Sequence, residues 1–195
     1  MVKIAPSAFL AGACIGIAGF AFLAVGGLGG MVLFAFGLLA VVHYGFKLYT
    51  GTAGFITKSE VGMLFWILLW NVIGCLAVSM LARISPLGIV DKASAVIQGR
   101  LDLGWWKCGL LSIGCGFIMT TAVTFARQGK MLPLLFGVPA FIACGFPHSV
   151  ADAFYYCCAP VFTSEAALWY VAIVAGNFIG CNLTRCLLPA VRTNK

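Results

Sequence analysis

Long apolar stretches alternate along the chain with short polar or glycine-bearing breaks. The apolar stretches are Ala8–Val25, Met31–Leu48, Val61–Leu81, Trp105–Ala126, Leu132–Gly145 and Ala166–Leu188. A membrane-spanning helix needs roughly 20 predominantly apolar residues, a length that most of these stretches approach or reach. The pattern therefore predicts an all-α integral membrane protein with six transmembrane helices.

Two short polar segments complicate this pattern, because each would interrupt a helix at membrane depth. One covers residues 46–56, with Lys47, Thr50 and Gly51, and the other covers residues 145–152, with Pro147 and His148. Non-helical backbone inside a membrane is tolerated only where it is buried in protein or lines a watery cavity. Paired interruptions in two halves of a chain mark the transport site of many transporters. We therefore expect helices 2 and 5 to be interrupted around a pore.

A short repeat supports a division into two halves. Asn-Val-Ile-Gly-Cys at residues 71–75 reappears as Asn-Phe-Ile-Gly-Cys at residues 177–181. Each copy lies in the third predicted helix of its half, and an odd number of helices per half inverts the second half relative to the first. The sequence thus predicts one membrane channel domain over residues 1–195, with inverted halves at approximately 1–85 and 104–195. The alternative is that the repeat only reflects small residues at helix contacts.

The external loop at residues 86–103 joins the two halves. Its apolar residues are Ile89, Val90, Ala93, Ala95, Val96 and Ile97. This spacing predicts a short amphipathic helix lying on the membrane surface.

Composition supports a membrane protein. The 195 residues are 63% hydrophobic and 9% charged, with a mean hydropathy of +1.09, whereas soluble domains carry about 25% charged residues. The net charge is +7, but the basic residues are scattered singly, so the chain is not expected to bind nucleic acid. A membrane flank or a small anion suits this charge better.

The distribution of basic residues sets the expected orientation. With both termini in the cytoplasm, the basic residues inside are Lys3, Lys58, Arg127, Lys130, Arg192 and Lys195, and those outside are Arg83, Lys92, Arg100 and Lys107. Cytoplasmic loops carry an excess of Lys and Arg, which favours this orientation. We expect a multi-pass protein of the inner membrane.

His148 is the most informative single residue, since an ionisable side chain in a membrane segment is costly and marks a functional site. Pro147 removes a backbone donor just before it and frees carbonyls. The unperturbed pKa of histidine, about 6.5, suits proton transfer. Thr50, from the other interruption, could face this histidine across a pore. The alternative is a histidine that only packs against a neighbouring helix. The cysteines lack paired CxxC spacing, so no metal or cofactor is expected.

The residues around His148 resemble a known family. Gly-Phe-Pro-His-Ser-Val-Ala-Asp at 145–152 is similar to the signature GFxHSxAN of the formate/nitrite transporter family, and residues 45–51 resemble that family's interrupted second helix. The Asn-x-x-Gly copies also correspond. The resemblance, to a short bacterial member, implies an aquaporin-like fold and a homopentamer in lipid with one pore per protomer.

The resemblance also implies roles for individual residues. It makes His148 the pore proton donor or relay, Thr50 and Gly51 the pore loop, and Arg100 or Lys107 the attraction for anions in the external vestibule. The implied constrictions are Leu38, Leu48 and Tyr49 in one set and Met119 and Phe141 in another. Three residues depart from the family pattern, namely Lys47, Gly116 (where asparagine commonly contacts the pore) and Asp152 (where asparagine follows the histidine).

The expected function is a channel for small monovalent weak-acid anions, formate first, with nitrite or hydrosulfide as alternatives. A low dielectric favours the neutral acid, so protons should move with the anion past His148. An aquaporin-like channel for neutral solutes is the rival of another class, but the Asn-Pro-Ala pair of those channels is absent. An intramembrane protease using Ser149 or Ser79 is disfavoured, because no nucleophile motif accompanies them. The chain is not expected to be an enzyme.

Overall fold

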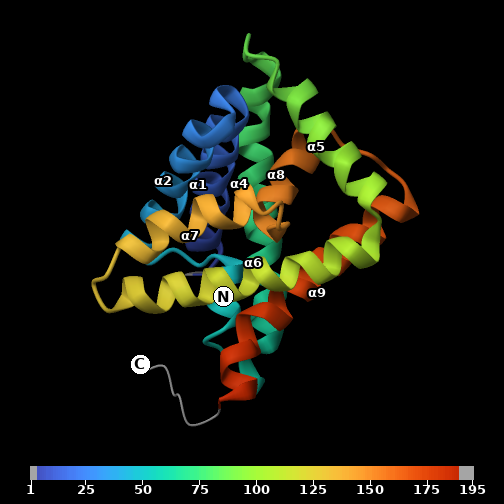
Figure 1. Ribbon diagram of the computed structural model, residues 1–195. Coiled ribbons are helices and arrows are strands. Elements are labelled where there is room, and N and C mark those ends of the chain that lie inside the picture. The colour runs from blue at the N-terminus through green and yellow to red at the C-terminus, as the bar shows by residue number, and fades with distance from the viewer. Residues whose placement is uncertain (1–3, 189–195) are drawn as a thin grey trace.

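The computed structural model describes residues 4–188, so Lys3, Arg192 and Lys195, which contribute to the predicted orientation, lie outside the described residues. Within that range the chain is helical, without strands (Figure 1). In order, the helices are α1 (Ile4–Val25), α2 (Gly27–His43), α3 (Tyr49–Ala53), the 3-10 turn η1 (Lys58–Glu60), α4 (Val61–Ile84), α5 (Ile89–Leu103), α6 (Trp105–Arg127), α7 (Leu132–Ala143), α8 (Ser149–Cys158) and α9 (Ser164–Leu187).

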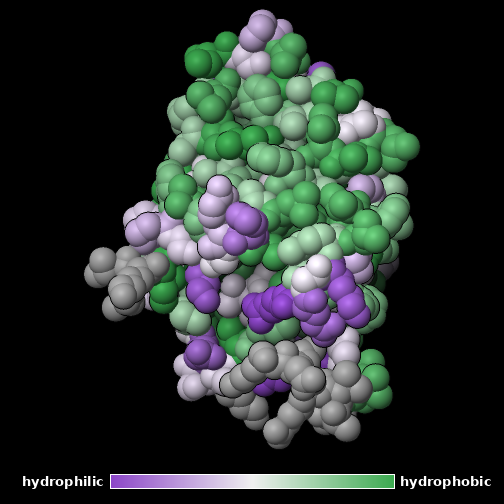
Figure 2. Space-filling view, turned by 90° about the vertical axis from the view of Figure 1, so that its left-hand side faces the viewer, coloured by the Kyte–Doolittle hydropathy of each residue, from purple (hydrophilic) through white to green (hydrophobic). Residues whose placement is uncertain are grey.

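Four of the described helices, α1, α4, α6 and α9, are long and apolar enough to cross a membrane, with 22 to 24 residues each. At 1.5 Å per residue these helices are about 33–36 Å long, slightly more than the roughly 30 Å of bilayer hydrocarbon. Figure 2 shows a largely hydrophobic face, with hydrophilic residues gathered toward one end of the molecule. This surface is that of a multi-pass membrane protein.

The second and fifth predicted helices are each broken into two pieces, α2 with α3 and α7 with α8. The interruptions lie at residues 44–48 and 144–148, so the predicted extents, 46–56 and 145–152, are wrong: Tyr49–Ala53 is helical, and α8 begins at Ser149. The count of six spans stays a prediction for these broken segments.

Glycine determines where α2 and α7 end. Gly45 and Gly145 have φ angles of +66° and +68°, a conformation that suits a residue without Cβ. The N–H of Phe46 donates to the carbonyl of Val41 at 2.9 Å, and the N–H of Phe146 donates to that of Phe141 at 3.0 Å. These bonds complete the Schellman motif, which satisfies carbonyls at the helix end. Both helices thus stop in the same way.

Glycines also allow the long helices to pack closely in two pairs, α1 with α4 and α6 with α9 (Figure 1). A Cβ on Gly12 would lie 2.0 Å from the carbonyl oxygen of Asn71, and one on Gly116 would lie 2.2 Å from that of Asn177. Gly116, which departs from the family pattern, thus lies in a helix contact that has no room for a side chain. The repeated contact is what two related halves would produce, although the proposed boundaries of those halves stay a prediction.

The loop at residues 86–103 forms α5, which lies beside α8 at the edge of the molecule (Figure 1). Its apolar residues Ile89, Ala93 and Ile97 are 0–1% exposed. The predicted helix is present, but its predicted place on the membrane surface is wrong, because its apolar face packs against the protein. This packing brings Arg100 to the interruption between α7 and α8.

Candidate pore site between the two interrupted helices

The side chain of His148 lies at the interruption between α7 and α8 and is 2% exposed. Its Nδ1 accepts a hydrogen bond of 3.1 Å from the N–H of Ala151, which caps the start of α8. A neutral ring with an acceptor Nδ1 carries its proton on Nε2. That Nε2 lies 2.9 Å from the hydroxyl oxygen of Thr50, so Nε2–H donates to this hydroxyl. The structure thus brings together one polar side chain from each interruption.

Asn71 of α4 holds the first interruption in place. Its Oδ1 accepts from the N–H of Tyr49 at 2.9 Å, and its Nδ2 donates to the carbonyls of Ala8 at 2.7 Å and Lys47 at 2.9 Å. The first N–H groups of a helix have no partner within that helix, and the membrane offers no water to supply one. One fully buried asparagine therefore links α1, α4 and the start of α3.

Asn177 of α9 does the same for the second interruption. Its Oδ1 accepts from the N–H of Ser149 at 2.7 Å, and its Nδ2 donates to the carbonyls of Ser112 at 2.9 Å and Pro147 at 3.1 Å. The first interruption provides the same kinds of group, at positions 47 and 49. The asparagine of each Asn-x-x-Gly copy thus provides hydrogen-bond partners for the backbone groups at one interruption.

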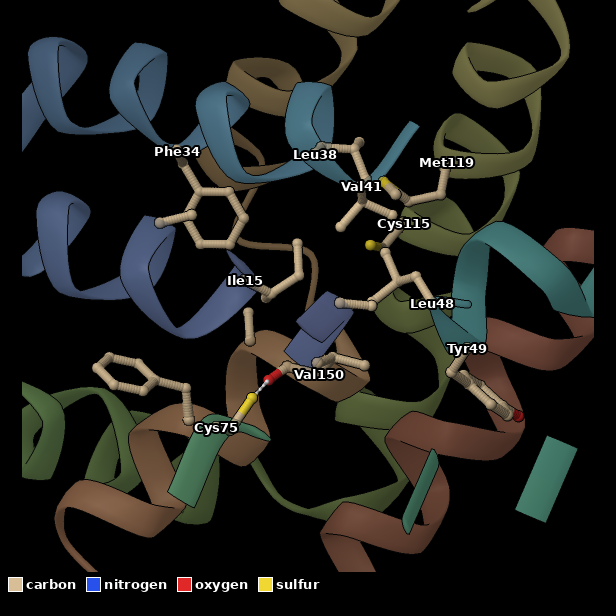
Figure 3. Packing of buried hydrophobic residues seen from close by; sticks show 14 of the residues in the cluster. Ile15, Phe34, Leu38, Val41, Leu48, Tyr49, Cys75, Cys115, Met119 and Val150 are labelled. Carbon is tan, nitrogen blue, oxygen red and sulfur yellow. Dashed lines mark hydrogen bonds between the residues drawn. The ribbon is translucent and has the colours of Figure 1, made fainter. Parts of the chain in front are cut away.

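The cysteine that ends each repeat contacts the short helix that follows the interruption of the other half. The Sγ of Cys75 donates to the carbonyl of Val150 at 3.3 Å, a bond drawn in Figure 3. The Sγ of Cys181 donates to the carbonyl of Thr50 at 3.4 Å. Each half therefore fastens the short helix of the other.

A cavity of about 320 Å³ opens beside α5 and reaches His148. Its wall combines aromatic and small apolar residues with the ionisable side chains of Arg100, His148 and Asp152, and it includes Phe34 and Phe141. The rings of Phe34 and Phe141 meet edge to face with centroids 6.1 Å apart, and Phe141 stacks on the imidazole at 5.7 Å. Both phenylalanines are nearly buried, at 2–3% exposure, so the cavity is apolar where it meets the histidine.

A second apolar group comprises Leu38, Leu48 and Met119, which are 0–1% exposed. Leu38 lies about one helical turn beyond Phe34 along α2, away from the cavity. Figure 3 shows these three side chains at the same end of the buried cluster. The assignment of Met119 to a constriction with Phe141 stays a prediction. Tyr49 points away from this group, and its hydroxyl donates to the carbonyl of Val174 at 3.2 Å (Figure 3).

Arg100 and Asp152 form an ion pair over the interruption, with Nε and Oδ1 2.8 Å apart. The Nη1 of Arg100 donates to the carbonyl of Gly145 at 3.1 Å, and Oδ2 of Asp152 accepts from the backbone N–H of His148 at 2.8 Å. Burial alone would lower the pKa of Arg100, but the carboxylate beside it favours the charged form, and the net pKa is raised. The departure at Asp152 thus supplies the partner of the predicted vestibule cation.

The remaining predicted residues lie outside this arrangement. The exposed Lys107 holds its Nζ 5.4 Å from the ring of Trp106 and is not part of the cavity wall. Lys47 is also exposed, and its backbone N–H donates to the hydroxyl of Ser7 at 3.0 Å. Gly51 lies within α3 and is half-buried.

Sequence reasoning missed Phe34 as a wall residue, because nothing in an apolar helix distinguishes one phenylalanine from the others. The dipeptide Gly-Phe that ends α2 and α7, at 45–46 and 145–146, is no unique signal either, because it also occurs at 19–20, 54–55 and 116–117.

Comparison with known proteins identifies related membrane transporters. The sequence model of the family described as Formate/nitrite transporter matches residues 1–191. The "Uncharacterized transporter YrhG" of Bacillus subtilis (strain 168) is 33% identical over 171 residues, covering 77% of this chain and 61% of that protein. The "Formate channel BtFdhC" of Bacillus thuringiensis is 27% identical over 177 residues, covering 78% of this chain and 68% of that protein. The matched part is thus about three fifths to two thirds of these relatives' length.

Solved structures share the fold. A "Pentameric formate channel with formate bound" superposes with a TM-score of 0.79 at 19% identity, covering 97% of this chain and 96% of that chain. An "FNT family ion channel" superposes with a TM-score of 0.75, also at 19% identity, over 98% and 90% of the two chains. The interrupted helices therefore belong to an architecture found in membrane channels.

Proposed function

Because the chain belongs to the formate/nitrite transporter family, we propose that it is a membrane channel for small monovalent weak-acid anions, with formate as its first substrate. The observation that carries this proposal is the contact of 2.9 Å between His148 Nε2 and Thr50 Oγ1 at the end of the cavity. It places one exchangeable proton where two interrupted helices meet. The relatives named as a formate channel and a probable formate transporter support the choice of formate.

Passage as the neutral acid fits the apolar surroundings. Burying an ion costs several kcal/mol even after relaxation, and a low dielectric shifts a carboxylic acid toward its protonated form. Formate entering between Phe34 and Phe141 would thus gain a proton from cavity water and continue as formic acid. Until it is protonated, the anion would accept a hydrogen bond from Nε2–H of His148.

The ring of His148 is suited to this task in its neutral form. Its Nδ1 accepts from the N–H of Ala151, and a ring protonated on both nitrogens could not accept that bond. His148 therefore carries no charge at rest, and its Nε2–H holds formate by a hydrogen bond while cavity water delivers the proton from the external solution. Leu38, Leu48 and Met119 would form the barrier on the far side, which the neutral acid crosses at lower cost than the anion.

The proposal extends to the alternative substrates, the oligomeric state and the membrane. Nitrite and hydrosulfide, the other weak-acid anions of similar size, are alternative substrates. A homopentamer in the lipid of the inner membrane, with both termini in the cytoplasm, is the proposed arrangement. The solved neighbour described as pentameric supports the oligomer.

The test is flux through the purified protein in liposomes, followed by stopped-flow light scattering. Formate, nitrite, hydrosulfide and acetate are each tested at two pH values, with glycerol as the neutral-solute control and protein-free liposomes as the background. We expect formate flux well above background that rises as pH falls. Glycerol flux without flux of any of the four acids would refute the proposal.

A further inference from the structure

Arg100 is the cationic side chain among the residues that line the cavity. A free guanidinium there would attract anions toward His148. Its Nε is bonded instead to the carboxylate of Asp152 at 2.8 Å, and its Nη1 to the carbonyl of Gly145 at 3.1 Å. The side chain is 18% exposed, so it reaches the cavity while two of its donor groups point into the protein.

Asp152 is held firmly as the counter-ion. It is 1% exposed and lies in the first turn of α8. Its two carboxylate oxygens have separate partners, Arg100 for Oδ1 and the backbone N–H of His148 for Oδ2. The guanidinium and the backbone N–H thus fix the position of the carboxylate from two sides. The positive and negative charges therefore stay together beside the histidine.

We infer that Asp152 sets the anion affinity of the cavity by neutralising Arg100, so that this vestibule attracts anions only weakly. The inference rests on the proposed function, because it concerns how the same cavity takes up its substrate. With a net charge near zero beside His148, the cavity discriminates little in favour of an anion over its neutral acid. Asp152 is a specificity-determining residue in this sense and not a proton donor.

The size of the effect follows from Coulomb's law. An anion bound near His148 would lie on the order of 6 Å from the Asp152 carboxylate. At an effective dielectric between that of a protein surface and that of water, one unit charge at this distance changes anion binding roughly tenfold. Removing the carboxylate charge should therefore lower the half-saturating formate concentration by about this factor.

The experiment compares four variants in liposomes by their half-saturating formate concentration and maximal flux. Asp152→Asn keeps the shape and one acceptor for the His148 N–H while removing the charge, and Arg100→Gln removes the cation. The third variant combines both changes. Asp102→Asn is the matched control, because Asp102 is an exposed carboxylate on α5, the helix of Arg100, bonded to Gln98 at 2.8 Å and not part of the cavity wall.

We expect a roughly tenfold lower half-saturating concentration for Asp152→Asn, a roughly tenfold higher one for Arg100→Gln, and a value within about threefold of the unmodified protein for the double variant. Asp102→Asn should leave it unchanged. An unaltered value in Asp152→Asn would overturn the inference, as would a double variant that behaves like Arg100→Gln. If size-exclusion chromatography shows that Asp152→Asn misfolds, the double variant decides: a half-saturating concentration within about threefold of that of the unmodified protein supports the inference, and one equal to that of Arg100→Gln overturns it. If the unmodified protein carries no formate, the proposed function fails and not this inference alone.

Discussion

Replacing Asn177 tests whether the asparagine repeat holds the interrupted helices in place. Asn177→Leu keeps a side chain of similar length but removes all three of its hydrogen bonds, to the N–H of Ser149 and to the carbonyls of Ser112 and Pro147. The N–H of Ser149 and the carbonyl of Pro147 would then lose the partner that Asn177 provides, and the carbonyl of Ser112, inside α6, would lose its additional bond. The change should loosen the start of α8 and with it the position of His148.

The expected loss of stability follows from these bonds. A buried polar group left without its partner costs about 1–3 kcal/mol, while hydrogen bonds between membrane helices average about 0.6 kcal/mol and reach about 1.7 kcal/mol. Three groups together give a loss of about 2–5 kcal/mol. Asn71→Leu should cost a similar amount, because Asn71 also makes three such bonds.

The assay is reversible unfolding by SDS in mixed micelles, with helix content followed by circular dichroism. Asn182→Leu is the control on the same helix, because the half-buried Asn182 reaches outside α9 only to the carbonyl of Ala53. It should cost about 1 kcal/mol. A loss below about 0.5 kcal/mol for Asn177→Leu would show that the interruption does not depend on this residue.

Three further changes test other parts of the account. Gly116→Ala should lower the free energy of unfolding by about 2 kcal/mol or more, since its Cβ would meet the carbonyl oxygen of Asn177 at 2.2 Å. Gly51→Ala is the control: its nearest contact would lie at 3.6 Å, and it should change that free energy by less than about 1 kcal/mol. Equal effects of the two variants in an unfolding assay would contradict the packing argument. Thr50→Val removes the partner of His148 Nε2 and should reduce formate flux roughly tenfold, with Thr50→Ser recovering most of it; failure of serine to recover flux would argue against the hydroxyl. His148→Asn should alter the pH dependence of formate flux, and an unchanged pH profile would exclude a part for His148 in the protonation of formate.

Much of the fold could be predicted from the sequence, because the hydrocarbon of the bilayer requires membrane-spanning helices to be long and apolar. The four long helices follow from hydropathy, and the repeat at Asn71 and Asn177 reveals where the two interruptions are held. The ends of the interruptions are less accessible, because hydropathy does not distinguish an unwound turn from a short helix. Residues 49–53 are polar enough to suggest a loop, yet α3 forms there, with its first N–H bonded to Asn71.

Part of the site was also predictable. Each interruption contributes one notable polar residue, and the structure places His148 and Thr50 in contact. The Arg100–Asp152 pair was not foreseen, since the two residues are far apart in sequence and meet only because α5 folds back onto α8. The helix contact of Gly116 was not predictable for a related reason. A glycine in an apolar helix looks the same whether it faces a pore or another helix, and only the packing of α6 against α9 decides.

The central claim, that formate crosses with a proton past His148, is tested most directly by recording both species together. Liposomes containing the protein and a pH-sensitive dye receive an inward formate gradient, with protein-free liposomes to correct for leakage of formic acid. Passage as the neutral acid predicts acidification of the interior by about one proton per formate, at a rate that valinomycin and potassium do not change. Formate uptake that leaves the interior pH unchanged and accelerates when valinomycin dissipates the membrane potential would contradict the claim.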